Sequence, residues 1–195
     1  MNWVVVLTIL GGLITLASIV PYLIQIARHK AKPRIISWFI WTILPSISLV
    51  AAISQGKYAT AVLLFCSSSV TLSVLIVGWK HGNRKVTKLD VFCLIAALIG
   101  IIFWILSGSP VITILFTLLI SMLGGIPTFI HAWHKPYEEV WISFALASLG
   151  AFFILLTLND FSVIGLAYPL YIVIINFIYT LAIIIRRRYS KKNKR

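Results

Sequence analysis

Seven predominantly apolar stretches, each about as long as a membrane-crossing helix, recur along this 195-residue chain. The hydrocarbon core of a bilayer is about 30 Å thick, so an α-helix needs about 20 apolar residues to cross it. Apolar runs of this length cross as helices because backbone N–H and C=O groups find no partners in lipid. The sequence therefore predicts an all-α membrane protein, with seven transmembrane helices at residues 4–27, 35–54, 58–79, 89–107, 111–133, 140–158 and 162–185.

The composition leaves no room for a soluble domain beside these helices. Hydrophobic residues make up 61% of the chain and charged residues only 11%, far from the proportions of soluble proteins. The first ten residues contain no Lys or Arg, unlike the basic start of a cleaved signal peptide, so we expect the first helix to stay in the protein.

The net charge of +13 is distributed unevenly between the two sides of the predicted membrane. All Lys and Arg residues except Lys57 fall in alternate loops and in the C-terminal tail, which lie on one side. Because Lys and Arg in short loops mark the cytoplasmic face, we expect the N-terminus outside and the C-terminus in the cytoplasm, in the cell (plasma) membrane. The basic segments are then expected to contact anionic lipid, not nucleic acid.

Landmark residues recur after a shift of 106 positions. This shift aligns Pro21 with Pro127, Ser37 with Ser143, and Trp38 with Phe144. We interpret the chain as two parallel three-helix bundles joined by a linker helix, which lets the second bundle run in the same direction as the first. The expected parts are a first repeat at 1–79, a basic loop and linker helix at 80–110, a second repeat at 111–185 and a basic tail at 186–195.

This arrangement, with a proline near the cytoplasmic end of the first and fifth helices, resembles the SWEET and PQ-loop superfamily. The family's Pro-Gln pair reads Pro21-Tyr22 and Pro127-Thr128 here, and the resemblance covers nearly the whole chain. It implies a fold with a central pathway between the repeats. Members of the superfamily move sugars, amino acids or other small solutes, whereas the related KDEL receptors bind peptide signals.

Prolines inside the helices are candidate bending points, because proline removes one backbone hydrogen bond. The resemblance implies a set of hinge prolines, and Pro21, Pro45 and Pro127 match three of its positions. Gly125 adds local freedom just before Pro127. The alternative is that these prolines form static kinks, which membrane helices tolerate.

Polar residues one turn after two of these prolines are candidate gate residues. Gln25 follows Pro21, and His131 follows Pro127. His131 is a candidate for a gate or a proton-sensitive group, since imidazole titrates near neutral pH. The alternative for His131 is a polar residue near the membrane interface.

Aromatic and polar side chains within the helices are the candidate solute-binding residues. Trp41 lies too deep for the interfacial aromatic belt, and Trp38 is one turn nearer the membrane surface. The resemblance implies that an asparagine in the seventh helix contacts the solute, which matches Asn176, with Ser69 as the nearest equivalent in the first repeat. Packing between helices is the alternative for each of these side chains.

No set of nucleophile, base and acid indicates an enzyme, and no residue pattern indicates a metal site or a cofactor. Asp90 follows Thr87 in the Thr-x-x-Asp pattern of a helix cap, and Cys66 and Cys93 show no metal-binding spacing. Because no carboxylate falls at membrane depth, we expect facilitated movement of a small neutral polar solute by alternating access, with proton coupling as the alternative. The alternative is a non-transporting receptor or scaffold on the same fold, and association into a homo-oligomer is left open.

Overall fold

The computed structural model of this chain describes residues 2–84, 86–159 and 161–192. Lys85, Asp160 and residues 193–195 lie outside this description, as does the side chain of Cys93. The described part is almost entirely helical, and an isolated bridge between Arg34 and Asn83 is its only β-type pairing. The helices are α1 (Trp3–Ala17), α2 (Ile19–Ala27), α3 (Ile35–Ser54), α4 (Tyr58–Gly78), α5 (Lys88–Ser107), α6 (Pro110–His134), α7 (Trp141–Leu155) and α8 (Val163–Lys192).

Among the described residues, five helical stretches are long and apolar enough to cross a membrane. They are the combined α1 and α2, then α3, α4, α6 and α8 through Ser190. Helix α7 is apolar but only 15 residues long. An all-α, membrane-embedded protein is therefore confirmed at this level.

The first of these stretches is interrupted at Ser18, which separates α1 from α2. The Ser18 amide donates to the carbonyls of Ile14 and Thr15, at 3.0 and 3.2 Å. Pro21, three residues later, has no N–H to donate to the carbonyl of Ala17. The other internal prolines, at 45, 127 and 169, lie within helices that continue through them.

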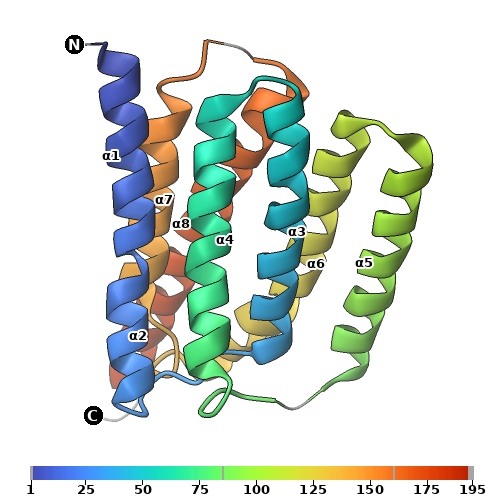
Figure 1. Cartoon of the computed structure of the whole chain (residues 1–195). Helices are drawn as coiled ribbons and strands as arrows, with labels where there is room; N and C mark the ends of the chain where they lie inside the picture. Colours follow the sequence, from blue (N-terminus) through green and yellow to red (C-terminus); the bar gives the residue numbers. More distant parts are fainter. Residues whose placement is uncertain (1, 85, 160, 193–195) are drawn as a thin grey trace.

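The helices run side by side, and the loops α2–α3, α4–α5 and α6–α7 gather at one end of the bundle (Figure 1). We call this the basic end, because these loops carry most of the Lys and Arg residues outside α8. Backbone hydrogen bonds join the loops to one another. The Asn83 amide donates to the Pro33 carbonyl at 2.8 Å, and the Lys32 amide donates to the Glu138 carbonyl at 3.1 Å.

The packing partners follow a regular order. Helix α4 contacts both α1 and α3, while α8 contacts both α6 and α7. Between these groups, α1 packs against α7 and α3 packs against α6. Helix α5 lies at the edge of the bundle, mainly against α6 (Figure 1).

Glycines bring α1 and α7 into close contact. A Cβ atom added at Gly11 would lie 2.6 Å from the Gly150 carbonyl oxygen and 2.7 Å from the Ile154 side chain. At neighbouring Gly12, the closest atoms to such a Cβ are side-chain atoms of Val62 and Cys66, at 3.2 and 3.4 Å. Gly11 therefore faces rigid backbone, whereas Gly12 faces side chains that can adjust.

Gly11→Ala is expected to destabilise the protein and Gly12→Ala is not. In both variants the higher helix propensity of alanine stabilises the protein by about 1 kcal/mol. Only Gly11→Ala also pushes α1 away from α7, which costs about 1–3 kcal/mol. Thermal unfolding of the two purified variants in the same detergent measures the difference. Equal melting temperatures for the two variants would show that the close contact does not constrain the packing.

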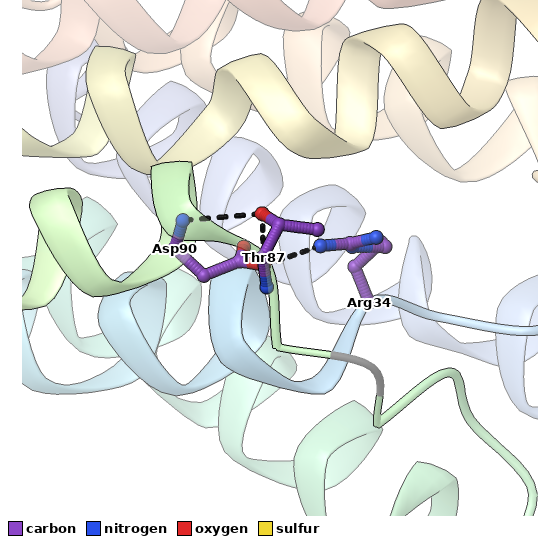
Figure 2. A network of polar contacts seen from close by, with 3 residues as sticks. All are labelled: Arg34, Thr87 and Asp90. Atoms are coloured by element: carbon purple, nitrogen blue, oxygen red, sulfur yellow. Dashed lines mark hydrogen bonds and ion pairs between the residues drawn. The ribbon is translucent and has the colours of Figure 1, made fainter.

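A buried ion pair fastens the start of α5 to the start of α3 (Figure 2). Asp90 Oδ2 accepts from Arg34 Nη2 at 2.6 Å and from the Thr87 amide and hydroxyl at 2.7 and 2.6 Å. The Asp90 amide also donates to the Thr87 hydroxyl at 3.3 Å, so the expected helix cap is present. The Arg34 contact is additional, and it ties the peripheral helix to the rest of the bundle.

Candidate functional site

A cavity lies inside the bundle, and residues from every helix except α5 line it. The space between the side chains, including the part that is open to the outside, is about 780 Å³. Its lining is mostly apolar and aromatic, with hydroxyl and amide groups between. The polar members are Thr15, Ser18, Tyr22, Ser67, Thr71, Ser121, Ser143, Tyr168, Tyr171, Asn176 and Tyr179, with the indoles of Trp38 and Trp41.

Of the four predicted solute-binding residues, Trp38, Trp41 and Asn176 line this cavity and Ser69 does not. The Ser69 hydroxyl instead donates to the Phe65 carbonyl of its own helix at 2.8 Å. On α4 the lining stripe comprises Ser67, Val70, Thr71 and Val74, which follow helical spacing. Ser69 falls on a different side of that helix, so the geometric expectation for Ser69 is wrong.

Some of the predicted hinge and gate residues line the cavity and others do not. Pro45 lines the cavity, while Pro21, Gly125 and Pro127 lie in the helices around it. Gln25 lies in the last turn of α2, where its backbone carbonyl accepts from the Lys30 and Ala31 amides at 2.9 and 3.0 Å. Gln25 therefore lies at the basic end and outside the cavity lining.

Gly125 has a packing role beside the expected flexibility. A Cβ at this position would lie 2.8 Å from the Tyr179 hydroxyl and 3.1 Å from the Trp41 ring. The Tyr179 hydroxyl donates to the Gly125 carbonyl at 2.7 Å, and Trp41 Nε1 donates to the Ser121 carbonyl at 3.0 Å. Two aromatic side chains thus bind the α6 backbone just before Pro127.

Aromatic rings fill the cavity wall towards the basic end. The rings of Tyr22 and Trp38 meet edge to face with centroids 4.9 Å apart, and those of Phe144 and Tyr179 stack at 4.9 Å. Trp41 connects the two pairs, at 5.5 Å from Trp38 and 6.0 Å from Tyr179. We call these five residues the aromatic cluster, and they come from α2, α3, α7 and α8.

The polar groups that face the cavity are uncharged. Buried Ser143 Oγ and Trp38 Nε1 have no partner in hydrogen-bond geometry, so both can meet a ligand. Asn176 donates from Nδ2 to the Ile172 carbonyl at 2.9 Å and keeps an acceptor oxygen. No Asp, Glu, Lys, Arg or His occurs among the described residues that line the cavity. Its chemistry suits a neutral solute with hydrogen-bonding groups and an apolar or flat face.

Behind the aromatic cluster, Glu139 is a fully buried acid. The Tyr22 hydroxyl donates to Glu139 Oε2 at 2.6 Å, while Oε1 has no partner. Burial raises the pKa of Glu139 to about 8, although the Tyr22 hydrogen bond acts in the opposite direction. The sequence pattern distinguishes neither Glu139 nor the adjacent Glu138.

Its neighbour Glu138 lies in a cluster of basic groups. Glu138 Oε1 is 3.8 Å from Lys32 Nζ and 3.5 Å from Lys135 Nζ. His131 Nε2 lies 3.1 Å from Glu138 Oε2, close enough for an ion pair but not in hydrogen-bond geometry. His131, a predicted gate residue, therefore belongs to this polar cluster at the basic end and not to the cavity wall.

Two arginines of α8 bind the end of α6 and the α6–α7 loop. Arg187 donates to the carbonyls of Pro136 and Glu139 at 2.9 and 2.7 Å. Arg186 donates to the Trp133 carbonyl at 3.0 Å, and its guanidinium lies over the Trp133 ring. These residues were expected to form part of a basic tail, but α8 continues through them and they bind the protein itself.

Among the described residues, no group of three or more His, Cys, Asp or Glu side chains could hold a metal ion. In comparisons with known proteins, no family model, curated protein or solved structure matches this chain.

Proposed function

We propose that this protein is a membrane transporter that moves a small neutral polar solute by alternating access. The observation that carries the proposal is the uncharged, partly polar cavity, whose wall towards the basic end is formed by the aromatic cluster. A site with hydrogen-bonding groups but no charge favours modest affinity, which suits a solute that must also leave.

The arrangement of the helices supports two repeats around this cavity, α1–α4 and α6–α8, with α5 as the linker. In these repeats α1 with α2 corresponds to α6, α3 corresponds to α7, and α4 corresponds to α8. The contact between α1 and α7 therefore has the contact between α6 and α3 as its equivalent, and both contacts are present. Within each repeat the third span, α4 or α8, contacts the other two. The same relations support the resemblance to the SWEET and PQ-loop superfamily, with seven spans and the basic end in the cytoplasm.

The proposal is tested by a ligand screen, which is followed by a measurement of uptake. Sugars, amino acids, nucleosides and vitamins are added to the detergent-purified protein, and a solute that binds the folded state raises its melting temperature. At a concentration of 100 times Kd the stabilisation is about 2.7 kcal/mol. The solute found is then tested for uptake into proteoliposomes, where the proposal expects saturable entry.

A cavity-filling variant supplies the control. Ala147 lines the cavity, whereas Leu149 on the same helix is exposed on the outer surface. Ala147→Phe should abolish both the thermal shift and the uptake, while Leu149→Phe should retain them. A solute that binds but is never taken up would overturn the transport proposal in favour of a receptor.

A further inference from the structure

We propose that Glu139 is a proton-binding site whose protonation is coupled to opening of the cavity at the basic end, so that the solute moves together with a proton. This inference rests on the transport function proposed above. The sequence alone predicted facilitated movement because it showed no acid at membrane depth. The structure instead buries an acid directly behind the aromatic cluster.

The surroundings of Glu139 favour its neutral form. Its Oε1 atom is buried without a partner, and Oε2 accepts the Tyr22 hydroxyl. No ion pair among the described residues includes its carboxylate. An ionised carboxylate in such a place would lack the compensating contacts that a buried charge requires.

The titratable and charged groups around Glu139 come from three elements. Tyr22 of α2 and Tyr179 of α8 face it from the aromatic cluster, and Glu138 adds a like charge beside it in the loop. Arg187 of α8 binds the backbone carbonyl of Glu139 at 2.7 Å and not its carboxylate.

The remaining basic groups nearby are paired with Glu138. Lys32, Lys135 and His131 all contact the carboxylate of Glu138. Two adjacent acids therefore have opposite environments: Glu138 is partly exposed among cations, and Glu139 is buried among aromatic rings. Only Glu139 gains from holding a proton in the closed state.

Opening of the basic end would reverse this preference. In the closed state the pKa of Glu139 is about 8, whereas a solvated glutamate has a pKa near 4.5. At neutral pH the acid is therefore protonated when the end is closed and loses its proton to water when the end opens. The converse also holds by linkage: deprotonation favours the open state.

Tyr22 offers a route for the proton from the cavity. It lines the cavity and its hydroxyl donates to Glu139 Oε2. The hydroxyl oxygen can accept a proton from a hydronium ion in the cavity, which becomes water, while the hydroxyl passes its own proton to Oε2 of the ionised Glu139; Tyr22 is left unchanged. One proton thus moves from hydronium in the cavity to Glu139, and opening releases one proton to water at the basic end.

Infrared titration of the purified protein tests the proton site. A protonated carboxylic acid has its own C=O stretching band, which is expected to disappear as the pH rises through about 8. Glu139→Gln should lack this transition, and Glu138→Gln, the matched control, should keep it. Tyr22→Phe removes a hydrogen bond that lowers the pKa, so its transition should move to higher pH.

A reporter cysteine tests the coupling to opening. Ser143, buried in the cavity wall, is replaced by cysteine in a chain that carries Cys66→Ser and Cys93→Ser. The alkylation rate of this cysteine is divided by that of an exposed cysteine introduced by Lys80→Cys in the same background. The ratio is expected to rise several-fold when the pH passes from below to above 8, and to stay low with Glu139→Gln. Glutamine keeps an acceptor for Tyr22, so a folded variant is expected.

Two infrared results would overturn the proton site. One is a carboxyl band that titrates only near the pKa of a solvated glutamate, and the other is a band that disappears in the Glu138→Gln variant. A labelling ratio independent of pH in the parent would overturn the coupling. Neither measurement needs the solute, so they fail separately from the proposed function. Saturable uptake without these pH effects would leave a facilitative transporter. The pH effects without uptake of any solute would leave a proton-gated cavity and sink the transport proposal.

Discussion

Asp90→Asn is expected to lower the free energy of unfolding by about 3–5 kcal/mol, the usual effect of removing one partner from a buried ion pair. Asparagine has nearly the same shape and can still cap α5 through its oxygen, so the change mainly removes charge. Arg34, whose side chain is only 10% exposed, would then hold an unpaired cation. Thermal unfolding in detergent, with a lower melting temperature as the expected result, measures the effect.

Two comparisons separate the ion pair from general damage. Glu138→Gln removes an acid from partly exposed ion pairs and should cost only about 0–1 kcal/mol. Combining Asp90→Asn with Arg34→Gln should recover part of the loss, because the double variant leaves no unpaired buried charge. An Asp90→Asn protein as stable as Glu138→Gln would show that the pair does not hold α5.

Asn176→Leu is expected to abolish uptake of the solute identified by the screen while the protein still folds. Asn176 is an amide in the cavity wall, and its Nδ2 bonds only to a carbonyl of its own helix. Leucine has the same branching at Cγ but no polar atom, so it removes solute recognition while the helix is kept. Proteoliposome uptake and the ligand-induced thermal shift should both be lost.

Ser69→Leu provides the matched comparison for Asn176→Leu. Both changes replace a polar residue of a membrane helix by leucine, but Ser69 does not line the cavity. Uptake by the Ser69 variant should therefore remain close to that of the parent. If Asn176→Leu transported normally, Asn176 would be a packing residue and the binding role predicted for it would be wrong.

The helices themselves could be predicted from the sequence because each is an apolar run bounded by polar residues. The predicted segment 35–54 coincides with α3, and 58–79 exceeds α4 by one residue. The break at Ser18 was not predicted, since the apolar run continues through it. The extension of α8 to Lys192 was also missed, because charge marks the edge of the membrane and not the end of a helix.

The faces of the helices were harder to predict than their positions. In a membrane protein the lipid-facing and inward-facing sides are both largely apolar, so hydrophobic periodicity does not reveal which side faces a cavity. Exposed Phe65 and Leu72, for example, lie on the same helix as the lining residue Thr71. Ser69 was therefore chosen by its position along the helix alone.

The different environments of Glu138 and Glu139 could not be read from the sequence either. The two acids are adjacent, have the same chemistry and precede the same helix. Tyr22 and Arg187, which define the place of Glu139, lie 117 and 48 positions away along the chain. Only the packing of α2 and α8 around the loop distinguishes the two acids.

The backbone contact between Gly11 and Gly150 has a mechanical consequence for the bundle. Helices that touch backbone to backbone cannot come closer at that point. We therefore expect α1 and α7 to change their mutual tilt by rotating about this contact. Glu139 lies 11 residues from Gly150, about 16 Å along the chain at helical rise, so a tilt of about 10° would displace it by about 3 Å. That displacement would break the 2.6 Å hydrogen bond to Tyr22. On the other side of this contact, the hydroxyl oxygens of Thr8 and Thr157 lie 3.3 Å apart. The same rotation would bring α1 and α7 closer together at Thr8 and Thr157 while it separates Glu139 from Tyr22.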